Sequence, residues 1–354
     1  MRRDRLTFAM VLGIPIVQLI LFGYAINTDP KHLPTVVVTG QSSIYARSVI
    51  SALQHSEYFA IRDTTVSRDQ ADKLMARGDI QFIISFPPNF SRDVLRGESP
   101  SLLIEADATD PVATSSAISA AASLPTALRH YLPINMQSSA PPLEVIVQRR
   151  YNPEAITQYN IVPGLMGVIL TMTMVLITAI AITRERERGT LEYLLVTPVR
   201  PFEVMTGKIV PYIMVGYIQV SLIMVAARVL FHVPMNGSIS MLYFLILFFI
   251  AANLSVGILF STIARNQMQA FQMSFFFFLP SILLSGFMFP FRGMPEWAQW
   301  IGEVLPLTHF LRIVRGLLLK DNGIMELLPN LWPLLLFTLV MLTVALKRYR
   351  QTLD

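Results

Sequence analysis

Six apolar segments of about 20 residues interrupt an otherwise mixed pattern of hydrophobic and polar positions. They cover residues 6–26, 161–183, 209–231, 240–262, 268–290 and 329–346. Because a helix rises about 1.5 Å per residue, each segment is long enough to cross the hydrocarbon core of a bilayer, which is about 30 Å thick. The pattern therefore predicts an α-helical polytopic membrane protein with six transmembrane helices.

Residues 27–158 follow a different pattern, in which short β-rich runs alternate with helical ones. The β-rich runs are TVVVTG, YFAIRDT, IQFIISFP, SLLIEADATD and LEVIVQRRYN. Between the last two we expect a long helix from Val112 to Tyr131, which Pro125 bends or ends. Strands that alternate with helices indicate an α/β domain. The chain is thus predicted to divide into a first transmembrane helix (1–26), an inserted α/β domain (27–158) and a five-helix transmembrane region (159–354).

The positions of lysine and arginine near the span ends predict the orientation. Twelve lie on the side of the N-terminus and four on the opposite side, all four between residues 291 and 328. Because positive residues collect on the cytoplasmic side, both termini are predicted to lie inside the cell and the α/β domain outside.

Composition excludes several other kinds of protein. Only 14% of the residues are charged, compared with about 25% in soluble domains. The chain has no cysteine, so disulfides and metal–thiolate sites are excluded. The net charge of +5 follows the positive-inside pattern, and we expect no binding of nucleic acid.

The densest charge cluster, RERER at residues 184–188, lies in the predicted cytoplasmic loop 183–208. Helical spacing pairs Arg184 with Glu187 and Glu185 with Arg188. With the leucines that follow, the segment predicts a short amphipathic helix at the membrane surface. A solvated loop that only sets topology is the simpler interpretation. Glu185, Glu187 and Glu192 do not serve topology, however. A mixed-charge helix with an apolar edge suits docking to a soluble partner.

Polar residues inside the predicted spans are candidates for a translocation path. They are Gln219, Arg228, Asn253 and Gln272. An ionisable group within a span is a functional candidate. The alternatives are that Arg228 reaches the outer interface and that the amides hold neighbouring helices together.

Residues 291–328 combine two tryptophans with several prolines, and Pro280 precedes them. We expect the prolines to break the path into short helices that re-enter the outer leaflet, with a surface amphipathic segment as the alternative.

Motifs of enzymes are absent from the sequence. It contains no G-x-x-x-x-G-K-[ST] nucleotide-binding loop, no HExxH and no GxSxG, and its five histidines have no metal-ligand spacing. We therefore expect no cofactor, no metal and no catalytic residue in this chain.

The segment RERERGTLEYLLVTPVRPFEVMTGKIVPY resembles the signature region of ABC-2 type transporter permeases. RYNPE at Arg150–Glu154 and PLTHFLRIVRGLLLKDNG at Pro306–Gly323 are also similar to this family's pattern, in the same order. The resemblance covers nearly the whole chain, and it is strongest to the bacterial branch of daunorubicin-resistance-like exporters with a large periplasmic domain.

The resemblance implies an ABC exporter subunit in the bacterial inner membrane that moves drugs or small amphiphilic compounds outward. Two such permeases, identical or different, would form the path, and separate ATPase subunits would bind ATP and magnesium. It also implies contact with lipid and allows a periplasmic adaptor and an outer-membrane channel. By resemblance, the residues that couple the chain to the ATPase are Arg184, Glu185, Glu187, Arg188, Gly189, Thr190 and Glu192.

Two other functions stay open on the sequence alone. A membrane receptor could sense a ligand with its external α/β domain, although six spans exceed what a sensor needs. A channel would not need a docking loop.

Overall fold

The computed structural model describes residues 16, 20–21, 29–39, 43–64, 66–128, 143–189 and 201–351. Asn27–Asn160 form one compact unit, and the helices from Ile161 onward belong to a second unit. The two are described separately. Of the predicted first span, only Ile16, Ile20 and Leu21 are described, so this span stays a prediction.

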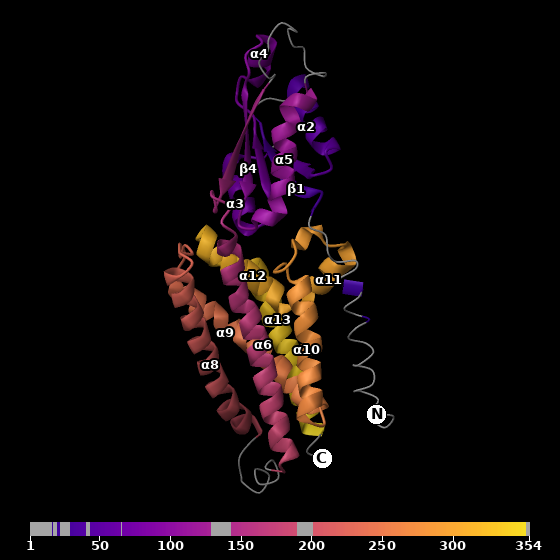
Figure 1. Cartoon of the computed structure of the whole chain (residues 1–354), viewed down its shortest axis with the longest axis vertical. Coiled ribbons are helices and arrows are strands. Elements are labelled where there is room, and N and C mark those ends of the chain that lie inside the picture. The colour runs from indigo at the N-terminus through magenta and orange to yellow at the C-terminus, as the bar shows by residue number, and fades with distance from the viewer. Residues whose placement is uncertain are drawn as a thin grey trace. The chain divides into compact units, whose positions relative to one another are not determined.

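A five-stranded sheet forms the middle layer of the first unit, in the order β2-β1-β3-β4-β5 (Figure 1). Its strands are β1 (Leu33–Val38), β2 (Phe59–Asp63), β3 (Phe82–Ser85), β4 (Ser101–Asp107) and β5 (Glu144–Arg150). The β3–β4 pair is antiparallel, and the other pairs are parallel. Each of the five β-rich runs therefore became a strand, and the prediction of an α/β region is confirmed.

Helices cover both faces of this sheet. They are α2 (Ile44–His55), α3 (Arg68–Arg77), α4 (Phe90–Leu95) and α5 (Pro111–Leu128). Helices α2, α4 and α5 bury residues such as Leu53, Phe90 and Ala117 on one face, and α3 buries Ala71 and Met75 on the other. This arrangement follows from the alternation along the strands, because successive side chains point to opposite faces.

The predicted helix from Val112 to Tyr131 is present as α5, which begins one residue earlier and is described to Leu128. Pro125 lies inside this helix and does not end it.

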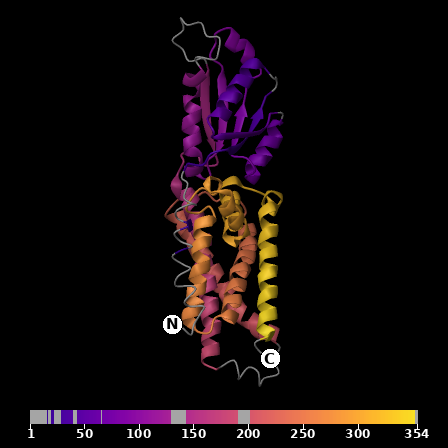
Figure 2. The ribbon, with the colours of Figure 1, turned by 90° about the vertical axis from the view of Figure 1, so that its right-hand side faces the viewer.

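The second unit is helical. Its long helices are α6 (Thr157–Glu187), α8 (Pro201–Val229), α9 (Ile239–Ile263), α10 (Gln267–Leu284) and α13 (Ile324–Gln351). They run side by side, as the two ribbon views show (Figures 1 and 2). Within the described residues, five helices are long and apolar enough to cross a membrane. They correspond to the five spans predicted after the α/β domain, and the chain is a multi-pass membrane protein.

The end of α10 and the start of α13 differ from the prediction. Helix α10 ends at Leu284 rather than near residue 290, and α13 begins at Ile324 rather than at 329. Pro280 does not break the path, because α10 continues through it. A proline inside a membrane helix is tolerated where neighbouring helices satisfy the freed backbone groups.

The segment 291–328 contains the predicted short helices, η1 (Phe291–Gly293), α11 (Glu296–Val304) and α12 (Pro306–Lys320). Nearly every residue of α12 is buried. Its Phe310 stacks on Phe249 of α9, with ring centroids 4.0 Å apart. A surface amphipathic segment is therefore the wrong interpretation for α12, whereas re-entry into the outer leaflet stays a prediction.

Helix α9 lies at the centre of the helical unit. Two thirds of its most apolar window is buried inside the unit, compared with 17% for α8. Gly257 lets α9 approach α6 closely, since a Cβ atom there would lie 2.8 Å from the Thr178 Cβ and 2.9 Å from the Val175 carbonyl oxygen. In the hydrocarbon core, such close contact between helices depends on small residues.

Candidate coupling site and polar positions of the membrane helices

The charged cluster is the end of a long helix. Arg184–Glu187 form the last turn of α6, which starts at Thr157. This corrects both expectations for the charged residues, because Arg184–Glu187 belong neither to a separate short helix nor to a loop. The leucines of the predicted amphipathic helix lie outside the described residues. Helix α8 already begins at Pro201, so helices occupy both ends of the predicted loop 183–208. Proline is favoured at a helix start, since its missing N–H would have no partner there.

Gly189 ends α6. Its φ of 71° is left-handed, and its N–H donates to the Arg186 carbonyl oxygen at 3.2 Å. A left-handed glycine just beyond the last turn is a common way to end a helix, because it has no Cβ to clash. Gly189 thus has a local structural role in addition to the docking role that the resemblance implies.

The arginines of the cluster lie on the surface of the helical unit. Arg184, Arg186 and Arg188 are exposed, and the first two lie in the last turn of α6. Positive charge at a helix C-terminus is favourable because it meets the negative end of the helix dipole. Among the described residues, no ion pair joins Arg184 to Glu187, whose carboxylate bonds elsewhere, so this part of the expected helical pairing is wrong. The pairing of Glu185 with Arg188 stays a prediction.

Glu187 instead bonds to a different helix. Its carboxylate accepts the backbone N–H of Gln267 at 2.9 Å and the side-chain Nε2 of Gln267 at 2.5 Å. Gln267 is the first residue of α10, so the carboxylate satisfies an N–H that the helix itself cannot pair. A negative charge is also favoured at this positive end of a helix dipole.

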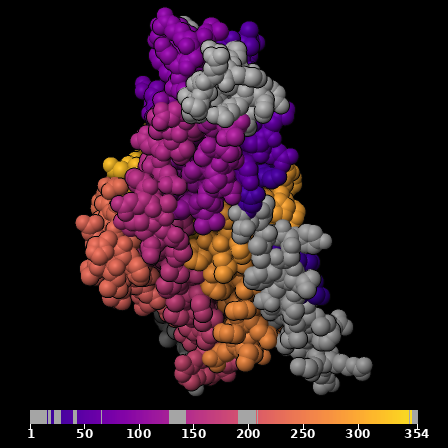
Figure 3. Space-filling model, turned by 45° about the horizontal axis from the view of Figure 1, so that its top comes forward, coloured from indigo at the N-terminus to yellow at the C-terminus, as the bar shows by residue number. Residues whose placement is uncertain are grey.

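A tight connection between α9 and α10 completes this end of the unit. Asn266 Oδ1 accepts the backbone N–H of Gln269 at 2.8 Å, and Gln269 Oε1 accepts that of Arg265 at 2.9 Å. Beneath it, Ala179 of α6 packs with Ala264 and Ala270. Figure 3 shows α6 in magenta and α10 in orange beside each other. We call the exposed residues Arg184, Arg186, Arg188 and Arg265, with the Glu187–Gln267 contact, the coupling end.

The predicted coupling residues have different environments. Arg184, Glu187 and Arg188 are exposed at the coupling end, and Glu185 is half-buried. Thr190 and Glu192 lie outside the described residues. Sequence reasoning missed Arg186, Arg265 and Gln267. The first two were visible as positive charges on the cytoplasmic side, but nothing in the sequence linked Gln267 to Glu187.

Gln219 and Arg228 do not meet in one site. Gln219 accepts a hydrogen bond from the Thr173 hydroxyl of α6 at 2.9 Å, so it joins α8 to α6. Arg228 is exposed in the last turn of α8. These positions fit the alternatives of helix contact and interface better than a path.

Asn253 and Gln272 remain candidates for a translocation path. Asn253 is fully buried in α9 and donates to the Phe249 carbonyl oxygen at 2.9 Å. Its Oδ1, the Gln272 Oε1 and the Thr178 hydroxyl are buried and have no hydrogen-bond partner among the described residues. A buried polar atom without a partner costs about 1–3 kcal/mol, so such atoms call for a water, a ligand or a second subunit.

A polar cluster in the predicted outer segment was missed as a unit. Arg312 of α12 donates to the Glu303 carboxylate at 3.0 and 2.6 Å, and its guanidinium lies 4.7 Å from the centre of the Phe291 ring. Buried His309 lies 2.8 Å from the Glu303 carbonyl oxygen and 3.4 Å from Asn330 Oδ1. The cluster ties α11, α12 and α13 together. The PLTHFLR motif contains His309 and Arg312, which are polar residues in an apolar segment and could have indicated such a cluster. Their partners, Glu303 and Asn330, lie outside the motif.

The part of the chain that the structure describes contains no group of three His, Cys, Asp or Glu side chains that could hold a metal ion.

Comparison with known proteins places this architecture in a family. The profile of the ABC-2 family transporter proteins matches residues 5–347. The chain is 26% identical to the probable multidrug ABC transporter permease YbhR of Escherichia coli K12, over 99% of this chain and 95% of that protein. It is 28% identical to the corresponding permease YbhS over 99% and 94% of the two chains.

A third relative supports the same assignment. The inner membrane transport permease YhhJ of Escherichia coli K12 is 31% identical over 81% of this chain and 78% of its own length. No solved structure matches the chain significantly. The apolar helices, the inserted α/β unit and the match over nearly the full length agree: this chain belongs to the ABC-2 transporter family.

Proposed function

We propose that this protein is the permease subunit of an ATP-driven exporter in a bacterial inner membrane. A separate ATPase would bind ATP and magnesium and dock at the coupling end. Two permease subunits, identical or different, would form the path. The family membership and the names of the relatives support a transport subunit.

The contact between Glu187 and Gln267 is the observation that carries the proposal. It joins the end of α6 to the start of α10 beside four exposed arginines. A partner that pushes on those arginines would move both helices together. Since α6 packs on central α9 at Gly257, the displacement would reach the core of the helical unit.

The direction of transport rests on the orientation. With both termini inside, the coupling end faces the cytoplasm and the α/β unit faces the periplasm. The external unit could then meet an adaptor and an outer-membrane channel. The multidrug permeases among the relatives support drugs or other small amphiphiles as substrates.

Charge reversal at the coupling end tests this function. Arg186→Glu combined with Arg188→Glu reverses two exposed charges that have no partner among the described residues. Arg62→Glu is the matched control, since Arg62 is an exposed arginine of the α/β unit. The tagged full chain would be purified gently with its ABC ATPase. ATP-driven uptake of a fluorescent amphiphile would be measured in inverted membrane vesicles.

We expect that the ATPase no longer co-purifies with the double variant and that its rate of ATP-driven uptake falls at least tenfold. The control variant should keep both the ATPase and the uptake rate of the wild type. Purified chain without any ABC ATPase, or normal transport by the double variant, would contradict the proposal. The receptor or channel would then be the better interpretation.

A further inference from the structure

A pocket in the α/β unit has no role in the function proposed above. Its volume is about 270 Å³, and it lies where β4 and β5 end and α5 begins. Because β4 and β5 are parallel, their carboxyl ends, Asp107 and Arg150, lie at the same edge of the sheet. Ligands often bind at the carboxyl ends of parallel strands in α/β folds.

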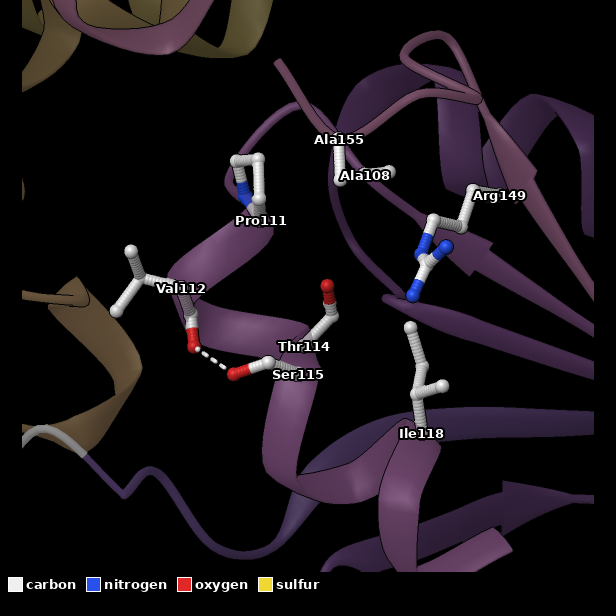
Figure 4. Close-up of a pocket in the computed structure, with 8 residues that line it drawn as sticks. All are labelled: Ala108, Pro111, Val112, Thr114, Ser115, Ile118, Arg149 and Ala155. Carbon is white, nitrogen blue, oxygen red and sulfur yellow. Dashed lines mark hydrogen bonds between the residues drawn. The ribbon is translucent and has the colours of Figure 1, made fainter. Parts of the chain in front are cut away.

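Most of the pocket wall is apolar. Pro111 and Ile118 of α5 contribute apolar side chains, and Ala108 and Ala155 lie together at one end (Figure 4). Val112 also lines the pocket, although its side chain points away from Arg149 (Figure 4). An apolar wall open to solvent gains free energy when a hydrocarbon group covers it.

Arg149 is the one charged side chain in the wall. Its guanidinium extends toward Thr114 and Ile118 on α5 (Figure 4). It has no hydrogen-bond or ion-pair partner among the described residues, and it is exposed.

The neighbouring Arg150 shows the contrast. It bonds to Asp72 and lies 3.8 Å from the Glu105 carboxylate. Successive residues of β5 point to opposite faces, so Arg150 reaches the α3 face and Arg149 the α5 face. Val145, four residues earlier, packs in the core cluster that contains Ala117 and Ala121 of α5, which confirms the face of Arg149.

The remaining polar groups near the pocket are already satisfied. The Thr114 and Ser115 hydroxyls donate to the carbonyl oxygens of Asp110 and Val112, at 3.4 and 3.1 Å. The Asp110 carboxylate accepts the Ala113 N–H at 3.3 Å and so caps the start of α5. The guanidinium, not the helix terminus, is therefore the group available to a ligand.

We propose that this pocket binds a small amphiphilic organic anion. A carboxylate, sulfonate or phosphate would take two parallel N–H donors of Arg149, which suit a planar or tetrahedral oxyanion. A short hydrocarbon group would cover Ile118 and Pro111. The volume lies just below the usual range for small-molecule sites, about 300–1,000 Å³, so the ligand is small. Binding at this pocket requires neither the ATPase nor transport.

Octanoate binding to the full-length chain tests the proposal. The chain would be placed in nanodiscs of phosphatidylcholine, and binding would be measured by calorimetry against empty nanodiscs. Octanol and octylammonium share the hydrocarbon group but not the negative charge. Arg149→Gln removes the cation, and Arg62→Gln removes an exposed arginine of the opposite edge strand, β2.

We expect octanoate to bind and Arg149→Gln to weaken it at least tenfold, while Arg62→Gln leaves it unchanged. Octanol and octylammonium should bind at least tenfold more weakly than octanoate. A second variant, Ser115→Phe, fills the pocket at an exposed helix position and leaves Arg149 in place. It should also abolish binding. Circular dichroism and the melting temperature would show that each variant is folded.

Three results would overturn the proposal: no octanoate binding to the wild type, equal binding by Arg149→Gln, or equal binding of octanol. Nanodiscs that contain phosphatidylglycerol separate two sources of the anion. Competition by the lipid would support a lipid headgroup as the natural ligand, and unchanged octanoate affinity would support a free small molecule. Because the assay contains no ATPase, its failure is distinct from a failure of the exporter proposal.

Discussion

The carboxylate of Glu187 caps the first residue of α10, Gln267, although the two residues are 80 positions apart in the chain. Glu187, a glutamate of the charged cluster, therefore has a partner within the chain. The exposed arginines beside it are available to a partner protein. The charge pattern alone does not distinguish the internal contact of Glu187 from docking by the arginines. Variants of the arginines therefore test docking, and variants of Glu187 test the contact between α6 and α10.

The Glu187–Gln267 contact should show as coupling in a double-mutant cycle. Glu187→Ala and Gln267→Ala each lower the thermal midpoint of the purified chain slightly, because each removes part of one hydrogen-bonded pair. The double variant should lose less than the sum of the two. Met268→Ala replaces Gln267→Ala in the control cycle, since Met268 is exposed next to Gln267. The decreases in thermal midpoint caused by Met268→Ala and Glu187→Ala should add. Simple additivity of the Glu187 and Gln267 variants would show that the contact does not form.

Gly257→Ala should destabilise the helical unit by about 1–3 kcal/mol, since overpacking forces a backbone shift. The added methyl would lie 2.9 Å from the Val175 carbonyl oxygen of α6. Gly207→Ala is the matched control, because a Cβ at this helical position of α8 meets nothing within 4 Å. It should be neutral or stabilising by up to about 1 kcal/mol, the helix propensity of alanine. Thermal unfolding in detergent measures both. Equal midpoints of the two variants would mean that α6 and α9 are not in close contact.

Glu105→Ala should loosen the α/β unit by about 2 kcal/mol, a typical loss for hydrogen bonds to a charged group. The Glu105 carboxylate is almost fully buried and binds Arg68, one bond measuring 2.7 Å. Its removal leaves Arg68 and Arg150 with Asp72 of α3 as the anion that they still share. Hydrogen exchange at β4 and β5 in the full chain should therefore increase. Glu98→Ala, at an exposed position, should leave exchange unchanged.

Tyr151 predicts a loss of stability at high pH. Burial, with a smaller contribution from the charge of Asp107, raises the pKa of this phenol from 10.0 to about 12. A raised pKa in the folded state means that its contribution is complete below pH 10.0, the unfolded value, and is lost as the pH rises toward 12. Proteolysis of the α/β unit should therefore accelerate over this range in the wild type.

Tyr151→Phe cannot ionise, so it should lack this part of the pH dependence. Its ultraviolet titration should also lack the phenolate that forms near pH 12 in the wild type. A variant whose profile matches the wild type would show that another group is responsible.

The pattern of the chain was sufficient for the elements themselves. Short β-rich runs that alternate with helical patterns predicted all five strands of the α/β unit. Apolar length predicted the five described spans. Both signals are local, because the period of a side-chain pattern and the thickness of a bilayer act on neighbouring residues. The predicted end of α10 was wrong because hydrophobicity continues past its last turn. The predicted start of α13 was wrong because the helix begins before the apolar segment and includes Glu326 in its first turn.

The sites depended on contacts that no local pattern encodes. The coupling residues of the cluster were named from the sequence by resemblance, and their coupling role stays a proposal. Arg149 and Arg150 are identical neighbours in the sequence. The sequence by itself determined that they lie on a strand and therefore face opposite ways. Only the tertiary structure decided that one meets Glu105 and Asp72 while the other lines a pocket, because that depends on which helix covers each face of the sheet.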